Sequence, residues 1–215
     1  MPLDPALFGP FLVVALAAIL SPGPDTLLIL RATLGGGQGP GFAALLGVQI
    51  GLLGHLAAAV FGISLLVMAA PLALQAIALA GALYLCWLGY RNIREAIGRT
   101  SSAIDMPAGT FSARAVCRDA ILTNLLNPKV ILLFIALMPG FVAPERGAVA
   151  LQLALLGTTI ILINIIWQGS LVLAAGRARR WLGRASVQRG LALGAGLVFF
   201  AFAGLMVAEF IALPF

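Results

Sequence analysis

The chain has 215 residues, of which 62% are hydrophobic and only 9% are charged, and its formal net charge is +6. A soluble domain is roughly 45–50% apolar and about 25% charged, and one of this size cannot bury so much apolar surface in an aqueous core. The composition therefore excludes an ordinary soluble protein. The basic residues lie in blocks between apolar runs, so no nucleic-acid partner is expected. We expect an integral membrane protein surrounded by the lipid bilayer.

Six apolar stretches predict an all-α membrane protein with six transmembrane helices, because runs longer than about 18 residues favour helices over barrel strands. In chain order, these stretches cover residues 6–30, 41–69, 71–92, 117–139, 147–175 and 190–213. They group into a first three-helix repeat, a cytoplasmic linker and a second three-helix repeat, over residues 1–92, 93–116 and 117–215. An odd number of spans in each repeat inverts the second repeat relative to the first.

The first and fourth helices are predicted to break at proline motifs, Pro22-Gly23-Pro24 and Asn127-Pro128. Proline removes a backbone donor and clashes with the preceding turn. In lipid, the backbone groups freed in this way are tolerated only where they face protein or a water-filled cavity. Paired breaks in corresponding positions of two halves are a pointer to a transporter's substrate site. The two motifs are therefore the candidate substrate-binding segments.

One charged residue follows each break, Asp25 after the first and Lys129 after the second. A helix N-terminus presents unpaired N–H groups, so Lys129 beside one can capture an anion, while Asp25 can hold an ammonium group or carry a proton. A zwitterion such as an amino acid fits this arrangement. The alternative is a structural Asp25–Lys129 ion pair. The two are not exclusive, because a pair that opens for a zwitterion would act as a gate.

Four amides are further candidates for substrate binding. Asn124 and Asn127 are three residues apart, which predicts that they share a helix face beside the second break. Their amides would either replace the hydrogen bonds lost at the proline or contact substrate. Asn164 and Gln168 are spaced i and i+4 on the fifth span, and because lipid exposure would be costly, we expect them to face the bundle interior and line a cavity.

His55 lies within an apolar span, where it is either a hydrogen-bonded packing residue or a proton relay. With Asp25, it is a candidate for proton coupling. Cys86 and Cys117 are isolated, with no nearby histidine, so we expect no metal site and no cofactor. Ser64 shares a span with His55, but no Gly-x-Ser-x-Gly motif surrounds it, and an enzyme is not expected.

The distribution of basic residues predicts the orientation of the chain. All of the 13 lysines and arginines except Lys129 and Arg146 fall in the loops after the first, third and fifth spans. Positively charged loops stay in the cytoplasm, so both termini are expected to face outward. Gly47 and Gly51 have the spacing that lets helix backbones approach closely, either within the chain or in a homodimer.

Several of these segments resemble motifs of the LysE/RhtB lysine exporter family. They are Ser-Pro-Gly-Pro-Asp-Thr at 21–26, Gly-Ala-Leu-Tyr-Leu-Cys-Trp-Leu-Gly-Tyr-Arg at 81–91, Thr-Asn-Leu-Leu-Asn-Pro-Lys at 123–129 and Pro-Gly-Phe at 139–141. The family often has glutamine where this chain has Gly140. The resemblance implies an inner-membrane secondary transporter that exports amino acids or their derivatives from a bacterium in exchange for protons.

A passive channel, or an exporter of another small solute, shares the broken helices and midplane charges. A metal-ion exporter would need a cluster of membrane carboxylates or thiolates, whereas Asp25 is the one clear intramembrane acid. A cationic side chain on the substrate would also require an additional carboxylate. The sequence therefore favours small neutral or apolar amino acids over lysine.

Overall fold

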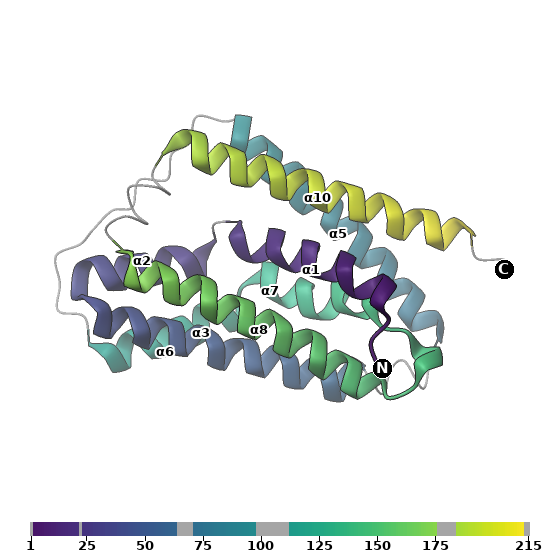
Figure 1. The fold of residues 1–215 in the computed structure, drawn as a ribbon, viewed down its shortest axis with the longest axis horizontal. Coiled ribbons are helices and arrows are strands. Elements are labelled where there is room, and N and C mark those ends of the chain that lie inside the picture. Colours follow the sequence, from purple (N-terminus) through teal and green to yellow (C-terminus); the bar gives the residue numbers. More distant parts are fainter. Residues whose placement is uncertain (1, 22, 64–70, 98–111, 176–183, 213–215) are drawn as a thin grey trace.

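All regular structure in the described part of the chain is helical (Figure 1). The computed structural model describes residues 2–21, 23–63, 71–97, 112–175 and 184–212. Its α-helices are α1 (Pro5–Leu20), α2 (Pro24–Gly36), α3 (Gln38–Ala58), α5 (Pro71–Ile97), α6 (Ala113–Leu125), α7 (Pro128–Leu132), α8 (Val149–Leu173) and α10 (Ala185–Ala212). Pro22, most of the expected linker and the end of the expected second span, residues 64–69, lie outside the described residues.

The chain breaks between α1 and α2. Asp4 caps α1, where its side chain accepts a hydrogen bond from the Ala6 amide at 3.0 Å. After α1 ends, Gly23 is extended, and Pro24 begins α2 at a position where its missing N–H would have no partner in the helix. The axes of the two helices differ by 48°. The break therefore turns the chain between two apolar helical segments.

A second break separates α6 from α7. Asn127 caps α7 by accepting a hydrogen bond from the Lys129 amide at 3.1 Å, and Pro128 is the first helical residue. The helix continues as a π-helical segment, η2 (Leu133–Leu137), and a 3₁₀ turn, η3 (Met138–Phe141). A second π-helical segment, η1 (Ala59–Ile63), follows α3. Such π turns occur frequently at functional sites.

Two groups of helices enclose the middle of the molecule. In one group, α3 packs against α2, α6 and α8, and in the other, α5 packs along α10. Figure 1 shows α1 and α7 between these groups. Gly47 and Gly51 lie against α6: an added Cβ would be 2.7 Å from Ala120 Cβ at Gly47, and 2.5 Å from Asn124 Oδ1 at Gly51. These glycines thus allow close helix packing within the chain.

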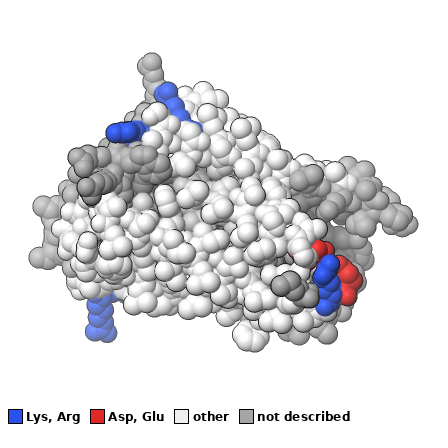
Figure 2. Space-filling model, viewed as in Figure 1, with Lys and Arg blue, Asp and Glu red and all other residues white. Residues whose placement is uncertain are grey.

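Apolar helices long enough to cross a membrane confirm the expected class, an all-helical membrane protein. Within the described residues, Gln38–Gly62 and Val149–Leu173 each meet this length and composition, and the bent α1–α2 pair makes a third when taken as one span. Figure 2 shows a face without charge across its middle. Basic residues lie near the starts of α6 and α10, at the end of the molecule that holds the α2–α3 turn, and a mixed acidic and basic group lies at the opposite end.

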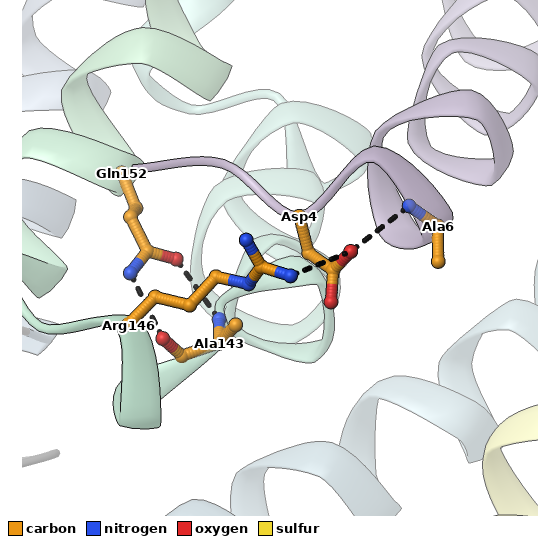
Figure 3. A network of polar contacts seen from close by, with 5 residues as sticks. All are labelled: Asp4, Ala6, Ala143, Arg146 and Gln152. Atoms are coloured by element: carbon orange, nitrogen blue, oxygen red, sulfur yellow. Dashed lines mark hydrogen bonds and ion pairs between the residues drawn. The ribbon is translucent and has the colours of Figure 1, made fainter. Parts of the chain in front are cut away.

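The second of these ends is held by a polar network around the loop before α8 (Figure 3). Gln152, which is fully buried, donates to the carbonyls of Ala143 and Gly147 at 2.9 and 2.7 Å and accepts from the Ala143 amide at 2.9 Å. Arg146 lies 3.4 Å from the Asp4 carboxylate. The start of α1 is thereby joined to this loop.

Candidate functional site

A cavity lies where the α1–α2 break meets the α6–α7 break. Its volume is about 40 Å³, counted as space for the centres of water-sized molecules. One water needs roughly 10–15 Å³ on this measure, so the cavity has room for a few waters. Its lining includes these polar residues: Ser21, Asp25, Thr26, Asn127, Lys129, Asn164 and Gln168.

Asp25 contributes a negative charge from the first turn of α2. Its Oδ2 accepts hydrogen bonds from the side-chain amides of Asn124 at 2.9 Å and Asn127 at 3.4 Å. Its other oxygen, Oδ1, is buried and accepts no hydrogen bond from the described residues. Buried polar atoms nearly always have a partner, which makes this oxygen a candidate contact for a bound donor.

Lys129 contributes a positive charge from the first turn of α7. Its Nζ donates to the main-chain carbonyl of Ser21 at 2.9 Å, just beyond the end of α1. A Cβ added at Gly23 would be 3.9 Å from the same Nζ, so the first break passes directly beside the ammonium group. Asp25 and Lys129 also interact electrostatically. The two opposite charges therefore line one cavity, as both an ion pair and a zwitterion site require.

The spacing of the two asparagines beside the second break predicted that they share one helix face, but they do not lie on one continuous helix. Asn124 is in α6, which ends one residue later, whereas Asn127 is the cap of α7. They nevertheless converge, because both donate to the same Asp25 oxygen. Asn124 is fully buried, and its main-chain carbonyl oxygen lies 3.3 Å from His55 Nε2. Asn124 therefore connects His55 to Asp25.

His55 is not part of the cavity lining. It is half-buried, and its ring stacks on Phe134 with 5.8 Å between centroids. Among the other predicted residues, Gly23 lines the cavity and Pro24 and Pro128 begin the two helices after the breaks. No group of three metal-ligating side chains occurs among the residues that the structure describes.

An amide cluster forms the wall on α8. Gln49 of α3 donates to Asn164 Oδ1 and Gln168 Oε1, both at 3.1 Å, and all three residues are buried. The Gln49 oxygen itself has no hydrogen-bond partner among the described residues. Sequence reasoning did not select Gln49. The available signal was an amide in the middle of an otherwise apolar span.

This combination defines a class of protein. Apolar helices interrupted at two points, with opposite charges brought to one cavity lined by polar side chains, are characteristic of membrane transporters built on discontinuous helices. A family model for LysE type translocators matches residues 16–209. The chain belongs to this family, which confirms the resemblance found in its motifs.

Curated relatives match most of the chain. A leucine efflux protein of Enterobacter sp. (strain 638) is 29% identical over 92% of both chains. A homoserine/homoserine lactone efflux protein of Salmonella typhimurium is 31% identical over 80% of this chain and 82% of its own. An uncharacterized membrane protein of Vibrio cholerae is 34% identical over 77% of this chain and 79% of its own. No solved structure matches.

Proposed function

We propose that this protein exports neutral amino acids or their derivatives across the bacterial inner membrane. Its efflux relatives are named for leucine and for homoserine and its lactone. The observation that carries the proposal is the placement of Asp25 and Lys129 around one cavity. An amino acid carries the complementary pair of charges on adjacent groups.

In this proposal, each end of the zwitterion has a partner. The substrate ammonium donates to Asp25 Oδ1, the buried oxygen that accepts no hydrogen bond within the described structure. The substrate carboxylate binds the Lys129 ammonium, which lines the same cavity. Asp25 is the one acid among the described lining residues, so a cationic side chain would have no second carboxylate. This favours a neutral substrate.

The cavity must open to admit its substrate. A space for a few waters is smaller than an amino acid, so binding separates groups that now touch, including the Lys129–Ser21 contact of 2.9 Å. We propose that this opening alternates between the two sides of the membrane. The small cavity volume supports a carrier of this kind over a passive channel, which is the alternative.

We further propose that six spans form two inverted three-helix repeats. The first comprises α1–α2, α3 and α5, over residues 1–92, and the second comprises α6–α7, α8 and α10, over residues 117–215. The support is that each repeat begins with a helix broken at a proline, followed at once by a charged residue. The helices at the boundary extend into the proposed 93–116 linker, because α5 continues to Ile97 and α6 begins at Ala113.

The proposed orientation places both termini outside the cell. The basic end in Figure 2 would face the cytoplasm, in agreement with the positive-inside rule. The Asp4–Arg146 contact supports one shared side for the N-terminus and the loop before α8. Because Gly47 and Gly51 already pack on α6, a homodimer would need another surface.

Proton coupling is proposed to involve Asp25 and His55. The support is a path through Asn124, whose side-chain amide donates to Asp25 and whose main-chain carbonyl lies beside His55. Efflux from preloaded proteoliposomes, measured with and without an imposed pH gradient, tests it. Coupling predicts faster export when the pH gradient drives protons in the direction opposite to the substrate. Equal rates with and without the gradient would contradict coupling.

The binding proposal is tested with Asp25→Asn and Lys129→Met. Each removes one charge from the site, and losing a charged hydrogen bond of about 1.5–3 kcal/mol predicts a roughly 10- to 150-fold weaker substrate affinity. Asp119→Asn and Arg118→Met are matched controls, since they neutralise an exposed pair 3.0 Å apart on α6. Unchanged affinity for labelled leucine and homoserine in both site variants, given a wild type that transports them, would reject the site.

A further inference from the structure

Gln49 and two amides of α8 form a buried cluster beside the polar cavity. Gln49 Nε2 donates to Asn164 Oδ1 and to Gln168 Oε1, each at 3.1 Å. An amide nitrogen of this kind carries two hydrogens, so both donors of Gln49 are used. Asn164 and Gln168 line the cavity, whereas Gln49 is not part of the lining. Gln49 therefore touches the two cavity amides without forming the wall itself.

The hydrogen bonds from Gln49 determine which end of each cavity amide is available to a ligand. Because the oxygens of Asn164 and Gln168 accept from Gln49, the groups left over are their nitrogens, Asn164 Nδ2 and Gln168 Nε2. These nitrogens donate to no other residue that the structure describes. Unlike the Gln49 oxygen, they are not completely enclosed. The wall on α8 thus offers hydrogen-bond donors to the cavity.

This orientation has a cost at the Gln49 oxygen. Gln49 is only 7% exposed, and its Oε1 is buried without a hydrogen-bond partner in the described part of the chain. Buried polar atoms are rarely left in this state. The opposite orientation, in which Gln49 accepts from both amides, would present oxygens to the cavity instead. The two orientations therefore differ in the substrate group that the wall recognises.

We infer that Gln49 is a positioning residue, which holds Asn164 and Gln168 as donors for the substrate carboxylate. The inference rests on the proposed function, because it requires the zwitterion to occupy the polar cavity. A carboxylate has two oxygens that together accept about four hydrogen bonds, so Lys129 and the two amides can bind it at once. The substrate ammonium remains with Asp25. The wall on α8 is therefore selective for a carboxylate over a neutral group in its place.

The test compares an amino acid with its amide, in which a neutral carboxamide replaces the carboxylate. Wild-type protein, Gln49→Met and Gln168→Met are reconstituted in proteoliposomes. Competition by leucine and leucinamide against labelled leucine is measured, and so is competition by homoserine and its amide against labelled homoserine. Gln168→Met removes one cavity donor, and Gln49→Met frees both amides to turn. In each variant the preference for the amino acid should fall about five- to tenfold, since a charged acceptor loses more than a neutral one.

Gln152→Met is the matched control. It replaces another buried glutamine of α8 that makes hydrogen bonds, but one that lies at the loop before the helix and outside the cavity lining. It should lower stability and leave the preference unchanged. The double variant of Gln49→Met and Gln168→Met should change the preference by less than the product of the single effects, because Gln49 acts partly through Gln168.

Three results would count against this role. An unchanged preference in both Gln49→Met and Gln168→Met, in protein that still binds amino acids, would overturn the inference alone. Equal losses for the amino acid and its amide would do the same, because they would place the substrate ammonium, and not its carboxylate, against the amides. A wild type that binds neither leucine nor homoserine would overturn the proposed function as well.

Discussion

Replacing Gly51 by alanine is expected to force α3 and α6 apart. The added Cβ would lie 2.5 Å from Asn124 Oδ1 and 2.8 Å from Asn124 Cβ. Carbon atoms pack at about 3.5–4.0 Å, so the backbone of α6 must retreat by roughly 1 Å. Such overpacking costs about 1–3 kcal/mol, and weakening the bond between Asn124 and Asp25 costs about 1.5–3 kcal/mol more. The loss of stability corresponds to roughly 5–24 °C in unfolding temperature.

The assay is thermal unfolding of the purified protein in detergent, followed by counterflow after reconstitution. Gly54→Ala is the matched control, one turn further along α3. There, the nearest atom to an added Cβ is the flexible end of Leu125, at 3.2 Å, so the unfolding temperature should change by less than about 2 °C. If Gly51→Ala had the same unfolding temperature as Gly54→Ala and transported substrate at the wild-type rate, the argument for close contact at position 51 would be refuted.

Three other substitutions test the polar contacts and the backbone. Gln49→Leu leaves the oxygens of Asn164 and Gln168 without their donor and should cost about 2–4 kcal/mol in unfolding free energy. Gln152→Leu removes three hydrogen bonds to the loop before α8 and should cost a similar amount, about 2–4 kcal/mol. Ala148→Gly should stabilise the protein by about 0.5–1 kcal/mol, because Ala148 has a left-handed conformation with φ of 48°. Each change is measured as a shift in unfolding temperature.

Each of these three has a control in the same region. Gln38→Leu, at the exposed start of α3, should leave stability unchanged, and equal effects at positions 38 and 49 would argue against the amide cluster. Gln152→Glu retains the acceptor for the Ala143 amide and should therefore destabilise the protein less than Gln152→Leu does. Ala154→Gly, inside α8, should lose about 1 kcal/mol, and a loss of that size at position 148 would contradict the expected gain.

The sequence was most informative where a charged residue stands in an apolar span. Lipid makes such residues costly, so Asp25 and Lys129 stand out from composition alone. The helical class follows from the same imbalance of apolar and charged residues. Prolines were a less certain guide: Pro24 and Pro128 each stand at the first residue of a helix, where the missing N–H costs no helical hydrogen bond, whereas Pro10 lies inside α1.

Contacts between distant segments carried no comparable signal. Gln49 meets amides that are 115 and 119 residues away in the chain, and nothing on its own helix indicates these partners. The spacing of Asn124 and Asn127 predicts a shared helix face only if one helix runs through both residues, and α6 ends at Leu125. The π-helical segment Leu133–Leu137 is an ordinary apolar stretch in sequence, so its wider turn depends on packing rather than on residue type.

The oxygen that holds the Lys129 ammonium belongs to the main chain of Ser21. No side-chain replacement at position 21 can delete that oxygen; the serine hydroxyl is a separate group, 3.4 Å from Asn92 Oδ1. Point substitutions at position 21 would thus test the hydroxyl but not the main-chain carbonyl that accepts a hydrogen bond from Lys129. Only a change in the course of the polypeptide, such as a one-residue deletion at the end of α1, would reveal it.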